Sequence, residues 1–316
     1  MNRPFVSARP HQAKAGPFRL PARLAVSLCA ASCVLRATAQ LAAAPALDLV
    51  AADRALVIGH RGYNVVAPEN TLPSFQMGLT AGADLVELDY HHSRDGVPVV
   101  MHDFTLDRTT DATNHWRTNA IKIADRTLAE IRSLDAGEWF SPLFAGTKVP
   151  TLVEALDLIQ TGGMTLIERK GGDPAACVRL LRDRNLLNRV VVQSFDWEYL
   201  REYHELEPAQ VLAAIGPPKL MADGKEPSTG NGKLTVAHLD ELAKTGAKVV
   251  VWKHKAITPE IIQIVHRRGL KLWVYTVNDP WLANALLDWG ADGLITDNTS
   301  LIWKTLALRK WKAKSS

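Results

Sequence analysis

Short runs of apolar, mostly β-branched residues recur eight times after about Leu49, and stretches with helical spacing separate most of them. The runs are "LVIGH" (56–60), "LVELDY" (85–90), "TLIERK" (165–170), "RVVVQSF" (189–195), "VLAAI" (211–215), "KVVVW" (248–252), "KLWVYTV" (271–277) and "GLITD" (293–297). Continuous apolar strands that alternate with helices form a parallel sheet covered on both faces. Eight such units in roughly 250 residues predict an α/β fold, a (β/α)8 TIM barrel. A doubly wound sheet is the alternative, because periodicity alone does not separate the two.

Six of the intervening stretches carry apolar residues at i, i+3 and i+4, which predicts helices. Most of them end in Gly, a common residue just past the C-terminus of a helix. They are residues 71–82, 150–162, 173–185, 235–246, 258–269 and 279–290.

Two long polar segments interrupt this alternation. Residues 91–150 follow the second run with a short extra strand, "VPVVM", and then a polar and aromatic stretch, and residues 216–234 are rich in Gly, Pro and Ser. We therefore expect a barrel over residues 50–310 with a small insertion at 103–150. Both segments would lie at the C-terminal face of the barrel, where active sites are built.

The N-terminal segment has the pattern of a targeting signal, so we do not expect it to belong to the fold. The first 47 residues contain no Asp or Glu, and the apolar run 24–35 precedes the small residues Ala37-Thr38-Ala39. This pattern predicts a signal peptide over residues 1–39, cleaved near Ala39, and a secreted or periplasmic protein. An organelle transit peptide is the alternative.

The net charge does not indicate a nucleic-acid partner. Six of the 37 basic residues and none of the 33 acidic ones lie within residues 1–39, so the remaining chain is slightly acidic. No run approaches twenty apolar residues, so we expect no transmembrane segment in the mature chain. The basic C-terminus with Trp303 and Trp311 predicts a solvated closing helix, with contact to a membrane surface as the alternative.

Polar side chains gather where the predicted strands end. Glu87 and Asp89 share one face of the second strand. Two carboxylates so close repel each other unless a cation or a proton lies between them, and oxygen ligands favour Mg²⁺, Ca²⁺ or Mn²⁺. Three other strand ends carry charged or titratable pairs: His60-Arg61, His102-Asp103, and Glu168 with Lys170. Together they predict a bound cation, basic residues for an anion and two histidines for proton transfer.

The segments "HRGYNVVAPENTLPSF", "VELDYHHSRDGVPVVMHD" and "LIERK" resemble the glycerophosphodiester phosphodiesterase family. Further segments, "TLDRTTD", "LDAGEWF", "FAGTKVPTLVEAL", "VVQSFD", "VYTVND" and "GADGLITDN", match the family in the same order. The resemblance extends from about Val57 to Leu301 and implies a TIM barrel with a small insertion after the second strand.

Position by position, the resemblance implies Glu87, Asp89 and Glu168 as ligands of one divalent cation, Mg²⁺ or Ca²⁺. It implies His60 and His102 as the acid/base pair. Arg61 and Lys170 would contact the phosphate, and Glu69 with Asn70 would support Arg61 and the metal site.

Other residues at strand ends are expected to shape the site. Trp273 is expected to line the mouth of the barrel, with Gln193 and Asn278 facing inward. Strand alternation places His91 on the inward face as a site-lining residue and turns His92 away.

The implied reaction is metal-dependent hydrolysis of a small-molecule glycerophosphodiester to glycerol 3-phosphate and an alcohol. One alternative is a lysophospholipase D-type lipid phosphodiesterase, for which the 216–234 loop should form a larger apolar rim. The other is a non-catalytic binding protein on the same fold, which should lack some of the site residues.

Overall fold

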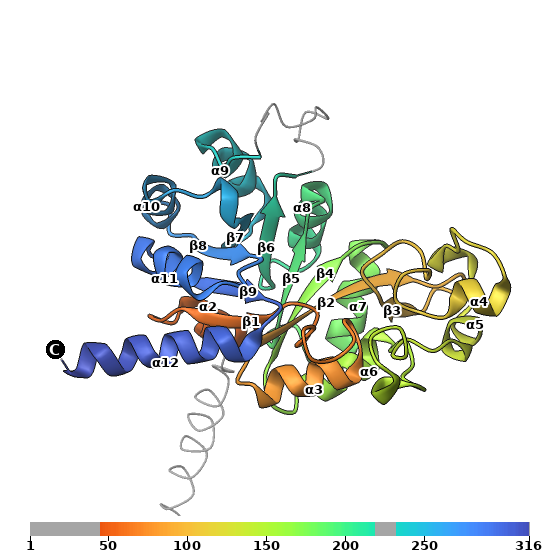
Figure 1. Cartoon of the computed structure of the whole chain (residues 1–316). Helices are drawn as coiled ribbons and strands as arrows, with labels where there is room; N and C mark the ends of the chain where they lie inside the picture. Colours follow the sequence, from red (N-terminus) through yellow and green to blue (C-terminus); the bar gives the residue numbers. More distant parts are fainter. Residues whose placement is uncertain (1–44, 219–231, 316) are drawn as a thin grey trace, which may run out of the picture. The chain divides into compact units, whose positions relative to one another are not determined.

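A computed structural model describes residues 45–218 and 232–315 of the chain. Within these residues eight parallel strands form a closed barrel with helices between them, as predicted (Figure 1). The strands are β1 (Leu56–Gly59), β2 (Leu85–His92), β4 (Met164–Arg169), β5 (Val190–Ser194), β6 (Val211–Gly216), β7 (Val249–Lys253), β8 (Lys271–Tyr275) and β9 (Gly293–Thr296). Pairing of β1 with both β9 and β2 closes the ring, so the doubly wound alternative is wrong. The predicted signal peptide, 1–39, and most of the 216–234 loop lie outside the described residues.

Most of the helices around the barrel begin at a capping side chain. Thr151 and Glu154 form a capping box at the start of α6 (Leu152–Ile159), and Asp196 and Asp279 accept backbone hydrogen bonds at the starts of α8 (Trp197–Leu206) and α11 (Pro280–Trp289). The surrounding helices are α3 (Leu72–Thr80), α6 (Leu152–Ile159), α7 (Pro174–Asp183), α8 (Trp197–Leu206), α9 (Val236–Leu242), α10 (Pro259–Arg267), α11 (Pro280–Trp289) and α12 (Thr299–Ser315). None of the described helices is long and apolar enough to cross a membrane.

The interior of the barrel is filled with apolar side chains and is closed at its N-terminal end. Helix α2 (Pro45–Ala51) places Ala46 and Val50 in the same buried cluster as strand residues such as Ile58 and Leu166. The backbone N–H of Ala46 donates to the carbonyl of Asn188, just before β5, at 3.0 Å. The polar groups of the barrel are therefore concentrated at the other end, where the strands finish.

Trp273 belongs to this interior, so the expectation that it lines the mouth is wrong. Its side chain is fully buried and packs on Gly293 of the neighbouring strand β9. Tyr275 lies two residues further along the same face of β8, nearer the strand's C-terminal end, and it does line the cavity at the mouth. Strand periodicity correctly predicts which face of β8 these side chains lie on, but it does not predict how deep in the barrel each one lies.

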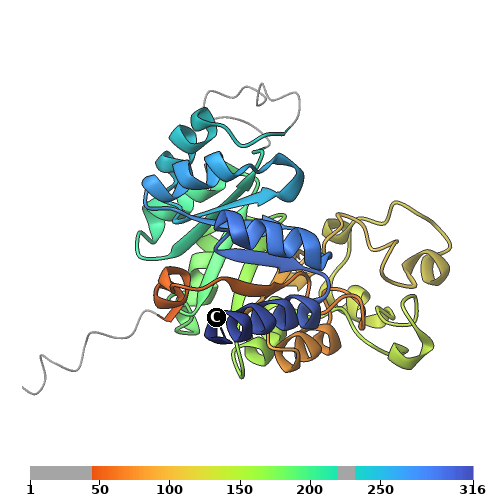
Figure 2. The same ribbon diagram turned by 60° about the vertical axis from the view of Figure 1, so that its left-hand side comes forward.

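The segment predicted as an insertion lies to one side of the barrel in both views (Figures 1 and 2). Strand β3 (Pro98–Val100) pairs antiparallel with the end of β2. Short helices follow: α4 (Ala112–Trp116), η1 (Ile123–Asp125), α5 (Leu128–Ser133) and η2 (Pro142–Phe144). They enclose a separate apolar cluster that includes Leu106, Ile123 and Ile131. This apolar cluster stabilises the segment, and polar loops of the segment lie beside the barrel mouth.

Replacing Gly293 by Ala tests the packing of the barrel interior. An added Cβ would lie 2.6 Å from Cδ1 of Trp273, which is fully buried and has no room to move. We expect a loss of about 1–3 kcal/mol in the free energy of unfolding, measured by chemical denaturation. Gly162→Ala is the matched control, since its Cβ would meet only Leu79 methyl groups at 3.8 and 3.9 Å. Equal stability of the two variants would contradict this account of the interior.

Candidate active site

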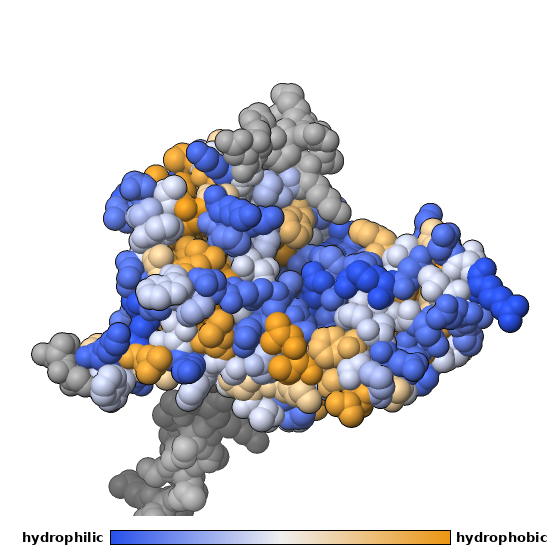
Figure 3. Space-filling view, viewed as in Figure 1, coloured by the Kyte–Doolittle hydropathy of each residue, from blue (hydrophilic) through white to orange (hydrophobic). Residues whose placement is uncertain are grey.

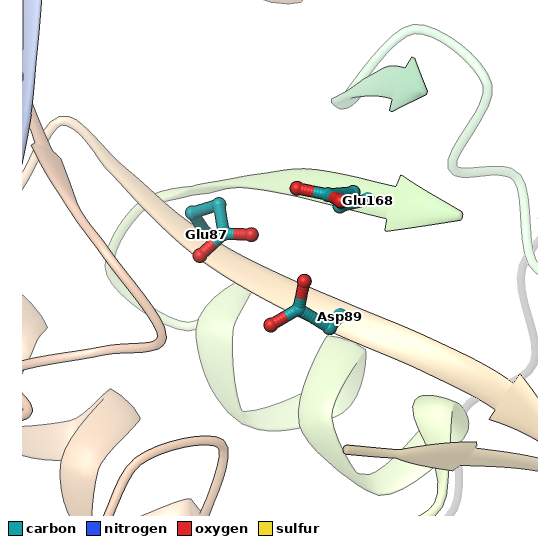
Figure 4. A group of neighbouring side chains, drawn as sticks. All are labelled: Glu87, Asp89 and Glu168. Carbon is teal, nitrogen blue, oxygen red and sulfur yellow. The ribbon is translucent and has the colours of Figure 1, made fainter. Parts of the chain in front are cut away.

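Three buried carboxylates lie together at the C-terminal end of the barrel. Glu87 and Asp89 come from β2 and Glu168 from the adjacent β4, where Asp89 and Glu168 are register partners. One oxygen from each of the three lies within 4.8 Å of the others. Figure 4 shows the carboxylates turned toward a common space between the two strands.

The electrostatics of this cluster fit a divalent cation. Burial, followed by the charges of Asp89 and Glu168, raises the pKa of Glu87 well above its usual value. Burial and then the charge of Asp89 raise the pKa of Glu168 to about 7. Oε1 of Glu87 is buried and has no hydrogen-bond partner among the described residues. Hard, oxygen-binding cations such as Mg²⁺ and Ca²⁺ take ligands of this kind, so the cluster can bind a metal ion.

Two basic side chains lie against the same carboxylates. Nζ of Lys170 is 3.1 Å from Oδ1 of Asp89 and also donates to Glu168. Nε of Arg61 is 3.5 Å from Oδ2 of Asp89, and the Arg61 backbone N–H donates to Glu87 at 2.7 Å. Burial opposes ionisation of Asp89, yet the charges of Lys170 and Arg61 lower its pKa to about 2. The site therefore combines three buried carboxylates with two cationic side chains that can receive a phosphate.

The loop after β1 is held in an uncommon backbone conformation. Arg61 and Asn70 have φ of 55° and 57°, in the left-handed region that few residues other than Gly adopt. The backbone N–H of Asn70 donates to the Arg61 carbonyl at 3.0 Å, and the Asn70 amide donates to Asp89 at 2.8 Å. Glu69 accepts from Nη1 of Arg61 at 2.9 Å. Glu69 thus contacts Arg61, and Asn70 contacts both Arg61 and Asp89.

Each of the two predicted histidines is held by a carboxylate through Nδ1. Nδ1 of His60 is 2.6 Å from Asp297, and Nδ1 of His102 is 2.7 Å from Asp103. Burial opposes ionisation of Asp297, but the hydrogen bond from His60 helps to lower the Asp297 pKa to about 2. Because an ionised carboxylate only accepts, each Nδ1 carries the hydrogen, and Nε2 is left to meet a substrate. Burial, the largest influence, lowers the pKa of His102.

Both histidines line a cavity of about 170 Å³ at the barrel mouth, together with Arg61, Lys170 and two of the carboxylates. Gln193, Phe195 and Tyr275 form part of its wall, and Ile215, Val251 and Ile295 add further apolar side chains. A second cavity, of about 470 Å³, shares His102, Glu168, Lys170 and Phe195 with the first and continues past Phe104 and Asp196. In Figure 3 hydrophilic side chains gather over the region where β2, β4 and the insertion meet.

The remaining candidates are displaced from the site in different ways. His91 lines neither cavity; its Nε2 is 3.2 Å from the His102 carbonyl, so it supports the backbone of that loop. His92 packs edge-on against Tyr90, away from the site. Asn278 lies outside the cavity lining but donates to Asp297 at 2.5 Å.

Sequence reasoning missed two residues that hold the site together. Asp297 directly follows β9, so applying the strand-end argument to this strand as well finds it. Arg108 lies in the insertion, in the segment "TLDRTTD", where no strand ends and no local signal indicates its contacts. The Arg108 guanidinium forms ion pairs with Asp103 and Glu69.

A TIM barrel with acidic, basic and histidine side chains at one mouth is typical of metal-assisted phosphoester chemistry. Comparisons with known proteins agree with this class. The chain matches the glycerophosphoryl diester phosphodiesterase family over residues 60–301. It is 34% identical over 276 residues to a glycerophosphodiester phosphodiesterase of Bacillus subtilis, covering 81% of this chain and 88% of the relative.

Solved structures show the same relationship. A phosphodiesterase from Oleispira antarctica, solved with the product sn-glycerol-3-phosphate, is 26% identical with a TM-score of 0.68, covering 80% of this chain and 96% of that one. A glycerophosphodiester phosphodiesterase from Agrobacterium tumefaciens is 27% identical with a TM-score of 0.64, covering 78% of this chain and 98% of that one. The chain belongs to the glycerophosphoryl diester phosphodiesterase family, as its sequence motifs predicted, and its enzyme class is that of the phosphoric diester hydrolases.

The raised pKa of Glu168 gives a pH prediction for the metal-free protein. The folded state keeps a proton on Glu168 up to about pH 7, whereas an unfolded chain releases it near pH 4.5. The folded state thus binds more protons between these values, and stability falls as pH rises through that window. In excess chelator, wild type should lose at least about 3 °C more in Tm than Glu168→Gln between pH 5 and pH 8. A divalent cation should remove the wild-type loss, and parallel Tm curves for the two proteins in chelator would contradict the prediction.

Proposed function

We propose that this protein hydrolyses glycerophosphodiesters to glycerol 3-phosphate and an alcohol by histidine acid/base catalysis at a single-cation site. One observation carries the proposal: His60 and His102 face the same small cavity as the carboxylate cluster and the two basic side chains. The product bound in the Oleispira antarctica phosphodiesterase supports glycerol 3-phosphate as the retained half of the substrate.

The chain's own residues would bind the phosphodiester as follows. Glu87, Asp89 and Glu168 would hold the divalent cation, which when bound polarises a phosphoryl oxygen and offsets its charge. Arg61 and Lys170, both partly buried at the cavity, would pair with the remaining phosphate oxygens. Their charge stabilises the negative charge that grows on phosphorus-bound oxygens during the reaction.

The two cavities support a direction for proton transfer. The larger cavity is lined by His102 and not by His60, so an alcohol group placed there has His102 beside its bridging oxygen. We assign His60, oriented by Asp297, as the base that takes a proton from the nucleophile. His102, oriented by Asp103, gives its Nε2 proton to the leaving alcohol oxygen as the P–O bond breaks. The lowered pKa of His102 makes its protonated ring a stronger donor.

The proposal for the location of the enzyme rests on the sequence alone. We propose that residues 1–39 direct it to a secreted or periplasmic location with cleavage near Ala39. N-terminal sequencing of protein recovered outside the cytoplasm tests this, and a mature chain that still begins at Met1 would contradict it.

A panel of glycerophosphodiesters tests the reaction and its metal dependence. Wild type should release glycerol 3-phosphate from diesters with different small alcohols, measured by a coupled assay for that product. Chelator should abolish release, and added Mg²⁺ or Ca²⁺ should restore it. Cleavage only of substrates that carry an acyl chain would favour the lysophospholipase D alternative, and full activity in chelator would contradict the metal site.

Leaving groups of different basicity test the histidine roles. With an alkyl alcohol as leaving group, His102→Ala should lower kcat by about 10²–10⁴-fold, because the departing oxygen needs a proton. With a 4-nitrophenyl ester of glycerol 3-phosphate the loss should be small, since nitrophenolate departs without one. His60→Ala should lose activity on both substrates, with Tm near the wild-type value. The reverse pattern would exchange the two roles.

A further inference from the structure

Arg108 is placed between two carboxylates of different loops. Its Nε and Nη2 donate to Asp103 at 2.7 and 2.9 Å, and its Nη1 and Nη2 donate to Glu69 at 2.9 and 2.7 Å. The planar guanidinium thus makes a two-point contact with each carboxylate. Paired parallel hydrogen bonds of this kind fix orientation as well as distance.

Each of these carboxylates in turn holds a side chain that lines the cavity. Asp103 accepts from Nδ1 of His102, and Glu69 accepts from Nη1 of Arg61. Glu69 lies in the loop between β1 and α3, whereas Asp103 follows β3 at the start of the insertion. In the part of the chain that the structure describes, Arg108 alone hydrogen-bonds to both carboxylates.

Arg108 does not itself reach the cavity where the reaction is proposed. It lines neither of the two cavities at the mouth. Any effect on catalysis must therefore pass through Asp103 to His102, or through Glu69 to Arg61.

A single ion pair would not need such a contact. The Arg108 side chain is 45% exposed, and one ion pair at such a position contributes little to the free energy of unfolding. The positions that the two contacts impose on Asp103 and Glu69 are a larger effect than their contribution to stability. A lysine at this position would carry the same charge but as a single point, and it would not form two forked contacts at once.

The charge of Arg108 also affects the carboxylate that holds His102. Hydrogen bonding from Arg108 is the largest of the influences that lower the pKa of Asp103. An ionised Asp103 only accepts, so Nδ1 of His102 keeps its hydrogen and Nε2 faces the cavity. The contact with Arg108 therefore helps to fix which ring nitrogen is presented to a substrate.

We propose that Arg108 is a positioning residue that sets the His102 ring and the Arg61 guanidinium at a fixed separation across the phosphate site. The inference rests on the proposed function. On this proposal, a residue of the insertion aligns the proton donor, His102, with the phosphate-binding residue, Arg61.

The experiment compares Arg108→Ala and Arg108→Lys with wild type on two substrates. These are glycerophosphoglycerol, which has an alkyl leaving group, and the 4-nitrophenyl ester of glycerol 3-phosphate. Arg108→Ala should lower kcat/KM about 100-fold on the first substrate and about 10-fold on the second, because misplacement of the donor matters only when the leaving oxygen needs a proton. Arg108→Lys should recover little of either loss. In the His102→Ala background, Arg108→Ala should cost no more than about 10-fold on glycerophosphoglycerol, since both changes act on the same proton transfer.

Arg132→Ala is the matched control. Arg132 lies in the same insertion and donates to the Val149 carbonyl and to Glu154, but it does not touch the site. This variant should leave the ratio of kcat/KM between the two substrates at the wild-type value.

Binding of glycerol 3-phosphate, measured by calorimetry in the presence of Mg²⁺, gives a readout that does not need turnover. Arg108→Ala should weaken binding about 10-fold through Arg61, and Arg132→Ala should leave it unchanged. If wild type hydrolyses neither substrate, the proposed function fails, and the binding comparison then decides the role of Arg108. A substrate ratio and an affinity in Arg108→Ala equal to those in Arg132→Ala would overturn the inference.

Discussion

Repulsion among three buried carboxylates is the constraint on which the mouth of this barrel depends. Burial, followed by the charges of the neighbouring carboxylates, raises the pKa of Glu87 and of Glu168. The neighbouring groups are arranged to offset this cost: Lys170 and the Arg61 backbone donate to the cluster, and the Asn70 amide fixes Asp89. The left-handed backbone at Arg61 and Asn70 is maintained because these contacts hold both ends of the loop. These contacts thus keep the three carboxylates together in a cluster that could hold a cation.

The barrel tolerates this arrangement because the polar and apolar parts of its interior are separated along the strand direction. Leu85 on β2 packs in the apolar interior, while Glu87 and Asp89, further along the same face, reach the mouth. Helix α2 covers the N-terminal end, so the side opposite the site is apolar as well. One face of β2 therefore contributes first an apolar core residue and then, further along the chain, two carboxylates of the candidate site.

Much of the fold and of the site could be predicted from the sequence, because periodicity indicated the strands and helices and the family motifs indicated the barrel and the roles of its residues. The eight strand runs predicted a barrel with a doubly wound sheet as the alternative, and the strand-end argument gathered Glu87, Asp89, Glu168 and Lys170 at one end of the sheet. Periodicity does not predict how far along the barrel axis a side chain lies. Trp273 was therefore expected at the mouth and Tyr275 was overlooked. Contacts between loops were not predictable either. Arg108 meets Glu69 across 39 residues of sequence, and nothing near either residue signals the other.

The pairing of His60 with Asp297 bears on how the enzyme is made. The two residues are 237 positions apart, and Asp297 directly follows β9, the last strand to be synthesised and a neighbour of the first. A nascent chain that has completed β4 already contains all three carboxylates, but its histidine has no carboxylate to orient it. Pairing of β1 with β9 therefore brings Asp297 to His60, so this contact forms only when the first and last strands of the barrel meet.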